Sequence, residues 1–283
     1  MRDIRQTKHY AEYLSRIGWG IERVGESYAF IKKLPLIGGV MKIQRPEKLR
    51  NKEIEKIKNL RKKYGVFQTI IEPKNTIHHS RAITIVSGDT RPFTIHGFRQ
   101  SQNPYLPSKT LCLDLTQSKN DLYNQMKKDA RYCLRKTKNL RICSIDKIDK
   151  FHTSWKEAVG FKKHKPSKKE LDTMLYAFKN NCQFITTPDG SAGAIFLKTK
   201  NRAYYWQAFA SSKGRAELAQ YKIVWAAILW AKKKRAKIFD FEGIYDKRFP
   251  NKSWLGFTHF KKSFGGYEVE YPGAFIKTQF PFK

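Results

Sequence analysis

Apolar positions in the first part of the chain recur at both helix and strand spacing. Tyr10, Leu14 and Ile17 fall at helical intervals and predict a helix over residues 6–17, and the same spacing predicts a second helix over 52–64. Short apolar runs bounded by glycine or proline predict strands over about 21–24, 28–32, 39–43, 66–72, 82–86 and 110–113. Strands and helices in this alternation are typical of an α/β chain.

A longer helix, predicted over residues 116–137, closes this first series of elements. Leu122, Met126 and Leu134 form its apolar stripe, and lysines and arginines occupy its remaining faces. From Arg141 the order of elements starts again. Helices are expected over 148–159, 168–180 and 216–234, and strands over 140–145, 183–187, 193–198, 203–210 and 238–241. The best domain boundary therefore lies near Arg141.

The charge of the chain changes this picture from a generic α/β protein to one with an anionic partner. Its 283 residues include 57 Lys and Arg against 24 Asp and Glu, a net charge of +33. A hydrophobic content of 40% with 14% aromatic residues excludes a disordered basic tail, because such tails lack the apolar side chains that offset chain entropy. The excess charge indicates phosphate or lipid head groups as partners, or a merely solvated basic surface.

Cysteine usage and the chain's start predict the compartment. Cys112, Cys133, Cys143 and Cys182 form no CxxC pair and no zinc-ligand cluster with histidine, so we expect no structural metal and no disulfide framework. The first residues lack the apolar core of a signal peptide, and no run approaches the ~20 apolar residues that span a bilayer. We expect a soluble, cytoplasmic protein.

Three segments between Leu113 and Gly266 carry recognisable motifs. The first is Leu113-Asp114-Leu115 followed by MKKDARYCLRK at residues 126–136. The second runs from YYW at 204–206 through YKIVW at 221–225 to FDFEGI at 239–244, and the third is FKKSFGG at 260–266. Together they resemble the FemABX family of peptidoglycan-bridge aminoacyltransferases. Residues 32–46 fit the family more loosely.

The resemblance implies a fold of two GNAT-like domains with mixed sheets flanked by helices. Domain 1 would span residues 1–140 and be completed by a C-terminal strand within 267–283, and domain 2 would span 141–266. The chain is short and lacks the helical coiled-coil arm of some family members. The implied activity moves an amino acid from aminoacyl-tRNA to the amine in the stem peptide of a nucleotide- or lipid-linked peptidoglycan precursor. We expect no cofactor.

The resemblance also implies two catalytic residues. An aminoacyl ester is already activated, so the enzyme must align the amine, remove its proton and stabilise the oxyanion. Asp114 matches the family's aspartate, for which we infer a base or amine-positioning role, with helix capping as the alternative. Lys261 matches the motif lysine and would stabilise the oxyanion or hold the terminal phosphate or ribose of tRNA. Lys262 is the candidate if the register is off by one, and a solvated surface lysine is the alternative.

Cationic side chains supply candidates for phosphate binding. Arg215, before a predicted helix, is the candidate for the precursor's diphosphate, and Lys33 and Arg45 would form the opposite wall. Arg131 and Arg135 are one helical turn apart and would face one anion, a tRNA or precursor phosphate, unless they belong to a solvated flank.

Aromatic residues gather in the second and third motifs. Tyr205, Tyr221 and Phe260 are candidates for stacking on the terminal adenine of tRNA or on uracil, and ordinary core packing is the alternative. The run Lys232–Arg235 serves the helix dipole and could also contact tRNA or an anionic membrane surface.

Two other classes of protein compete with this interpretation. An acetyl-CoA-dependent GNAT N-acyltransferase would carry a pyrophosphate loop of the type Q/R-x-x-G-x-G/A, and no such loop precedes a helix in this sequence. A non-catalytic RNA-binding protein would explain the charge but not the ordered motifs. The pattern carries no signal for the oligomeric state.

Overall fold

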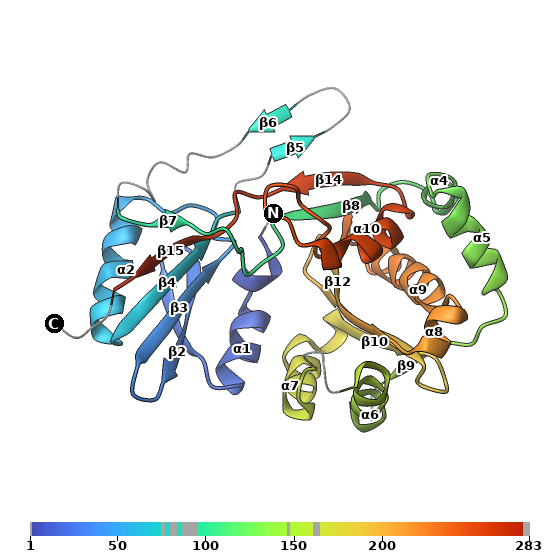
Figure 1. Cartoon of the computed structure of the whole chain (residues 1–283), viewed down its shortest axis with the longest axis horizontal. Coiled ribbons are helices and arrows are strands. Elements are labelled where there is room, and N and C mark those ends of the chain that lie inside the picture. Colours follow the sequence, from blue (N-terminus) through green and yellow to red (C-terminus); the bar gives the residue numbers. More distant parts are fainter. Residues whose placement is uncertain are drawn as a thin grey trace. The chain divides into compact units, whose positions relative to one another are not determined.

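A computed structural model describes residues 2–74, 77–79, 84–86, 96–145, 148–160 and 165–279 (Figure 1). The chain packs into two compact units. The first unit comprises Met1–Thr110, Tyr245–Asn251 and Glu268–Lys283, and the second comprises Leu111–Ile244 and Lys252–Tyr267. The first unit is therefore assembled from three separate stretches of chain.

A six-stranded sheet forms the centre of the first unit. Its strand order is β1 (Gly20–Val24), β2 (Ser27–Leu34), β3 (Gly38–Gln44), β4 (Val66–Glu72), β15 (Phe275–Thr278) and β7 (Arg99–Gln100). The β3–β4 pair is parallel and the other pairs are antiparallel. The C-terminal strand β15 thus lies between two strands from the first hundred residues, as Figure 1 shows. Strands β6 (Thr84–Val86), β5 (Ile77–His79) and β14 (Tyr267–Glu270) pair in this order as an antiparallel ladder.

Two helices accompany this sheet, α1 (Lys8–Arg16) and α2 (Asn51–Lys63), and a short 3-10 helix η1 (Ile4–Gln6) precedes α1. Helix α2 begins where the Arg50 backbone N–H donates to the Glu53 carboxylate at 2.9 Å. Its residues Ile54, Ile57 and Leu60 fall on one face and are buried in the core with the strands. This burial explains why the apolar spacing predicted the helix.

A second mixed sheet forms the centre of the second unit. Its strand order is β8 (Lys109–Asp114), β13 (Ile238–Asp240), β12 (Arg202–Ala210), β11 (Ala192–Lys198), β10 (Cys182–Thr186) and β9 (Cys143–Ile145), with β12 and β13 parallel and the other pairs antiparallel. The flanking helices are α4 (Lys119–Asn124), α5 (Lys128–Lys136), α6 (Ile148–Val159), α7 (Lys168–Phe178), η2 (Lys179–Asn181), α8 (Ser212–Ala216), α9 (Ala219–Lys233), η3 (Lys252–Trp254) and α10 (Leu255–Lys262).

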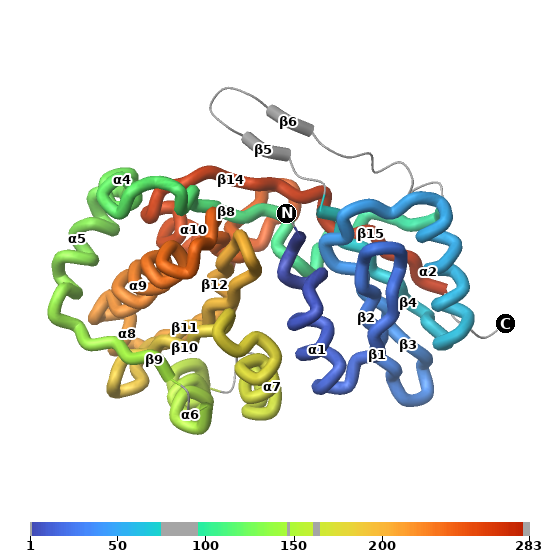
Figure 2. The backbone as a smooth tube through the Cα atoms, turned by 180° about the vertical axis from the view of Figure 1, so that it is seen from behind, coloured from blue at the N-terminus to red at the C-terminus, as the bar shows by residue number. Residues whose placement is uncertain are grey.

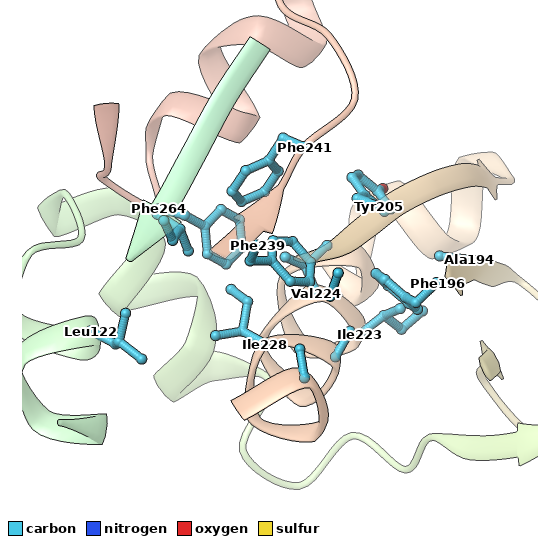
Figure 3. Close-up of a cluster of buried hydrophobic side chains, with 14 of the residues drawn as sticks. Leu122, Ala194, Phe196, Tyr205, Ile223, Val224, Ile228, Phe239, Phe241 and Phe264 are labelled. Carbon is cyan, nitrogen blue, oxygen red and sulfur yellow. The ribbon is translucent and has the colours of Figure 1, made fainter. Parts of the chain in front are cut away.

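Helix α9 packs into the core of the second unit. Ile223, Val224 and Ile228 are fully buried and lie among Phe196 and Phe239 of the sheet (Figure 3). Most residues of α9 are apolar, and a helix that is apolar over most of its circumference is usually buried in a core.

The helix predicted over 116–137 is two helices, and this is a correction. Ser118 caps α4, and the chain leaves helical geometry before Lys127, which has extended dihedral angles at the start of α5. The Lys127 backbone N–H donates instead to the Ser263 carbonyl at 2.9 Å. A contact with a residue far along the chain therefore ends a helix that the local pattern would continue.

The helix predicted over 216–234 is also interrupted. Leu218 has a positive φ of 56°, which separates α8 from α9. Helix α10 lies in a stretch for which the sequence predicted no helix. Of the strand predicted over 82–86, residues 82 and 83 lie outside the described residues, and 84–86 is β6.

The division into units differs from the predicted boundary near Arg141. Packing places residues 111–140 in the second unit, because β8 pairs with β13 and the helices after it pack in that unit's core. The short return over 245–251 is held in the first unit by Asp246, which accepts from the Ser108 hydroxyl at 2.6 Å, and by Arg248, which donates to the Tyr271 carbonyl at 3.1 Å.

Candidate functional site

A pocket of about 440 Å³ opens in the second unit between β12, α8, α9 and α10. Its wall is largely aromatic, with basic and polar groups added. The residues used below are Tyr205, Arg215, Tyr221, Phe257, His259 and Phe260. Four residues predicted from the sequence as binding residues therefore meet at one pocket: Tyr205, Arg215, Tyr221 and Phe260.

Ring contacts fix the aromatic side of this pocket. The Tyr221 ring packs edge-on against Phe260, with centroids 4.9 Å apart, and stacks on Phe264 at 5.7 Å. The Tyr205 hydroxyl donates to the Gln220 side-chain oxygen at 3.1 Å. Burial raises the pKa of both Tyr205 and Tyr221, so their phenols stay neutral hydrogen-bonding groups. Core packing and a place in the pocket wall are thus both true of these rings.

Lys261 lies on α10 directly behind this wall and is only 8% exposed. Its Nζ donates to the Gly243 carbonyl at 2.6 Å and lies 5.6 Å from the Tyr205 ring centroid and 4.9 Å from that of Phe257. Burial lowers the pKa of this amine to about 8, although Glu242 and Asp240 oppose the shift. Lys261 is therefore not a solvated surface lysine.

Asp240 organises the turn that holds Lys261. It accepts from the Arg202 guanidinium at 3.1 Å and from the Glu242 backbone N–H at 2.9 Å. Glu242 and Gly243 both have positive φ, so the turn is tight and aims the Gly243 carbonyl at the lysine. The aspartate of the second motif thus acts through the turn, a role that the sequence did not reveal.

Arg215 lies in the short helix α8 and is exposed at the rim of the pocket. Its guanidinium donates to the Ala210 carbonyl at 2.6 Å and to the Ser212 hydroxyl at 3.1 Å. At Gly214 an added Cβ would lie 2.4 Å from the Ser191 carbonyl oxygen, so α8 packs too closely for any side chain there. This close packing fixes where Arg215 stands.

Asp114 ends β8, on the strand next to the one that carries Asp240. Its carboxylate accepts from the Thr116 backbone N–H at 2.9 Å and from the Thr116 hydroxyl at 2.7 Å, whereas Ser118 caps the following helix. Burial raises the pKa of Tyr267 to about 12, and the charges of Asp114 and Asp240 add to this rise. Asp114 is thus a turn residue in an acidic neighbourhood and does not line the aromatic pocket.

The two candidates from the looser N-terminal match lie in the first unit. Lys33 is exposed at the end of β2. Arg45 is buried, has a positive φ, and donates to the carbonyls of Pro73 at 3.1 Å and Pro107 at 2.6 Å, with its guanidinium 3.5 Å from the Tyr271 ring centroid. These contacts explain Arg45 as a residue that joins three segments, and its part in ligand binding stays a prediction.

Arg131 and Arg135 lie on α5 and do not line the aromatic pocket. With Lys128 and Tyr132 they line a shallow hollow of about 480 Å³ on the surface of that helix. Arg131 also donates to the Asn124 carbonyl at 2.9 Å and so ties α5 to α4. In the basic run at the end of α9, Lys232 donates to the Leu115 carbonyl at 2.9 Å. The cationic flank is therefore partly structural and partly open to a ligand.

Within the part of the chain that the structure describes, no three His, Cys, Asp or Glu side chains gather as metal ligands would. None of the helices in those same residues is long and apolar enough to cross a bilayer.

Sequence reasoning missed part of this pocket. His259, Phe257 and Gln220 were not candidates, because α10 was not predicted and Gln220 reads as an ordinary polar residue of α9. The signal for α10 was present in Phe257, Phe260 and Phe264 at intervals of three and four residues.

Solved structures with this arrangement of elements define the fold. The crystal structure of FemX matches with a TM-score of 0.75 at 16% sequence identity, covering 98% of this chain and 92% of that chain. L-PGS from Bacillus licheniformis matches with a TM-score of 0.57 at 11% identity, covering 96% of this chain and 87% of that chain. A tandem GNAT protein from the clavulanic acid biosynthesis pathway matches with a TM-score of 0.52 at 8% identity, covering 89% and 82%. The expected tandem GNAT-like fold is thereby confirmed.

The chain also matches a protein-family model. The model of the FemAB family matches residues 144–283, which include the second and third sequence motifs. A comparison with curated protein sequences gives no match. The family match and the likeness to FemX both support the FemABX family, the family that the motifs of this chain resemble.

Proposed function

We propose that this protein is an aminoacyltransferase that moves an amino acid from aminoacyl-tRNA to the amine of a peptidoglycan precursor's stem peptide. The match to the FemAB family model and the likeness to FemX support this class of reaction. The observation that carries the proposal is the buried Lys261 amine, held by Gly243 behind a pocket that Arg215 and three candidate aromatic residues line. A surface built only to bind RNA would have no use for a buried cation with a lowered pKa.

The chemistry asks for one cation and one proton acceptor. The precursor's amine attacks the ester carbonyl, a C–N bond forms, and the ester C–O bond breaks as the tRNA oxygen leaves and takes a proton. Lys261 would offset the negative charge on the carbonyl oxygen, an effect that is large because the site is shielded from water. Asp114 would orient the incoming ammonium or accept its proton. Its bonds to Thr116 leave the second carboxylate oxygen for that task.

Binding of the two substrates is assigned to different groups. Arg215 would hold the precursor's diphosphate, and Tyr205, Tyr221 and Phe260 would contact uracil or adenine from the pocket wall. The face of α5 with Arg131 and Arg135 would meet phosphates of tRNA.

The test is a transfer assay with tRNA charged with radiolabelled amino acids and a nucleotide-linked precursor, run in parallel with labelled acetyl-CoA. We expect label to move from tRNA to the precursor and not from acetyl-CoA. Lys261→Met should reduce kcat/KM by a factor of about 100 or more, as loss of a group that stabilises transition-state charge does.

The matched control is Lys262→Met, which removes the neighbouring lysine of the same helix. It should keep kcat/KM within about twofold of the wild type, as surface charges usually do. Equal loss in both variants would show that general positive charge, rather than the buried amine, supports the reaction. Transfer from acetyl-CoA, or tight tRNA binding without transfer, would replace the proposal with one of its two competitors.

A further inference from the structure

The turn between β2 and β3 in the first unit carries an apolar tip that no part of its own unit covers. Leu36 is 97% exposed and Ile37 is 52% exposed, and Pro35 before them is exposed as well. Scattered exposed apolar residues need no explanation, but three in succession at the end of a hairpin form a projecting patch.

The backbone holds this tip out rather than letting it fold back. Leu36 has a φ of +66°, in the left-handed region where leucine is rare and glycine or asparagine is usual. The Ile37 backbone N–H donates to the Pro35 carbonyl at 2.8 Å, which closes the turn within three residues. A polar residue would fit this conformation at least as well, so its apolar side chains point to a role outside folding.

Strand register brings two other turns to the same end of this sheet. Strand β1 begins opposite Ile31, near the end of β2, and β4 begins opposite Gly39, near the start of β3. The Lys32 amine donates to the Gly18 carbonyl at 3.0 Å, and the Gly39 backbone N–H donates to the Gly65 carbonyl at 2.8 Å. The ends of α1 and α2 and the β2–β3 turn therefore form one edge, which both backbone views show (Figures 1 and 2).

This edge is basic around the apolar tip. Its exposed cationic side chains are Arg16, Lys33, Lys62 and Lys63. Glu12 and Glu22, which pair with Arg16 and Lys63 at 3.2 and 3.0 Å, offset part of this charge. Half-buried Trp19 lies at the same edge, with the amines of Lys32 and Lys42 at 6.0 and 5.2 Å from its ring centroid.

We propose that this edge of the first unit binds an anionic phospholipid surface. Leu36 and Ile37 would enter the boundary between head groups and acyl chains, and the lysines would face the phosphates. An apolar tip that projects, cations around it, and a tryptophan at head-group level are the combination that membrane interfaces favour. Two weak attractions of different kind give reversible surface binding, where either alone would be marginal.

The test is co-sedimentation of the full chain with vesicles of phosphatidylcholine alone or of phosphatidylcholine mixed with phosphatidylglycerol. We expect binding to the anionic vesicles, and weaker binding at high salt and without phosphatidylglycerol. The double variant Leu36→Asn, Ile37→Asn should bind at least about tenfold less, because it removes the apolar side chains that would insert. Asparagine tolerates a positive φ, so thermal unfolding of this variant should match the wild type.

The matched control is Tyr176→Asn, which removes a side chain of similar exposure, 53%, from α7 in the second unit. It should bind vesicles as the wild type does. The inference fails if the wild type stays in the supernatant with anionic vesicles, or if the double variant binds like the wild type. It also fails if the double variant instead converts a dimer to a monomer, because a second copy would then be the occupant of the tip.

Membrane binding has a consequence for the acceptor that rests on the proposed function. A transferase attached to the bilayer would meet a lipid-linked precursor rather than a soluble nucleotide. Transfer to a soluble nucleotide-linked precursor should therefore be unchanged in the double variant, while transfer to precursor in anionic vesicles should fall. Failure of vesicle binding with intact soluble transfer would overturn the membrane inference alone.

Discussion

Lys261 is the residue at which the proposed chemistry and the stability of the fold oppose each other. A lysine that is mostly removed from water pays for desolvation of its charge, and its bonds return only part of that cost. Residues of this kind persist when a reaction needs them. Because its pKa is lowered to about 8, the pH dependence of catalysis and the pH dependence of stability both test this conflict.

The first measurement is the pH dependence of catalysis. If the protonated amine stabilises the oxyanion, its contribution is complete below about pH 8 and is lost above it. Titration of the acceptor amine affects the wild type and Lys261→Met alike, so the ratio of their kcat/KM values isolates the lysine. We expect the ratio of wild-type to Lys261→Met kcat/KM to fall as pH rises through 8, and initial rates at several pH values measure it. A ratio that rises with pH would make Lys261 a general base instead.

The second measurement is stability against pH. The folded pKa of about 8 lies below the ordinary 10.5, so between these values the unfolded chain binds one more proton and wild-type stability rises with pH. At pH 7 the full cost is present, and Lys261→Met should raise the free energy of unfolding by up to about 3 kcal/mol. This difference should shrink near pH 10. Urea unfolding at both pH values checks it, and a less stable variant at pH 7 would contradict it.

Residue chemistry in the sequence identified the pocket only in part. Tyr205, Tyr221 and Phe260 could be found because they sit in ordered motifs. Arg45 shows the limit of that reasoning, because its carbonyl partners are 28 and 62 positions away and no local pattern reveals them. In a chain with many basic residues, the sequence does not show which of their side chains are already hydrogen-bonded within the fold.

At the scale of elements, the first and third motifs belong to one structural feature. Lys127 donates to Ser263, and Gly265 and Gly266 pack against Gln125 and the end of β8. The α4–α5 break therefore exists to receive the turn after α10. These contacts also place α10, and with it Lys261, so the motifs recur together because they pack together.

The predicted bounds of helices and strands were correct where local sequence alone determines the element. Strand β4 and helix α6 have the predicted bounds, 66–72 and 148–159, because their apolar spacing and flanking residues agree. Helix predictions failed at 116–137 and 216–234, where a distant carbonyl or the left-handed Leu218 interrupts a favourable local pattern. A long-range contact, not propensity, decided the first of these breaks, and a left-handed residue marks the second.

Gly266 provides the test of this feature. Its φ is +91°, and an added Cβ would lie 2.3 Å from the Cys112 carbonyl oxygen. Gly266→Ala should lower the free energy of unfolding by about 2 to 4 kcal/mol. Gly256→Ala in α10 is the control, because its Cβ meets nothing within 4 Å, and it should gain up to about 1 kcal/mol. Similar melting temperatures for the two variants would contradict the packing described.

At the scale of the whole molecule, the net charge of +33 would govern how the protein binds the tRNA of the proposed reaction. Each phosphate neutralised releases counterions, so affinity falls steeply as salt rises. Charge alone gives no specificity, which in the proposed reaction would come from the pocket residues of the second unit. The two contributions can be separated by their salt dependence.

For tRNA binding, we expect Arg131→Gln with Arg135→Gln to weaken affinity and to reduce the slope of log K against log salt by about 2, one for each lost phosphate contact. Lys156→Gln with Lys169→Gln removes the same charge from exposed positions on α6 and α7, and should leave the slope nearly unchanged. Filter binding at several salt concentrations measures both. Equal slopes for all three proteins would exclude α5 from the RNA contact.

The position of β15 in the first sheet has a consequence for biosynthesis. Residues 275–278 supply the partner of β4, so a ribosome must translate about 200 residues beyond β4 before that sheet can close. Until then the nascent chain presents a bare strand edge whose Ile70 and Ile71 side chains are destined for the core. Premature termination would therefore damage the part of the protein made first, and a chaperone would be needed there longest.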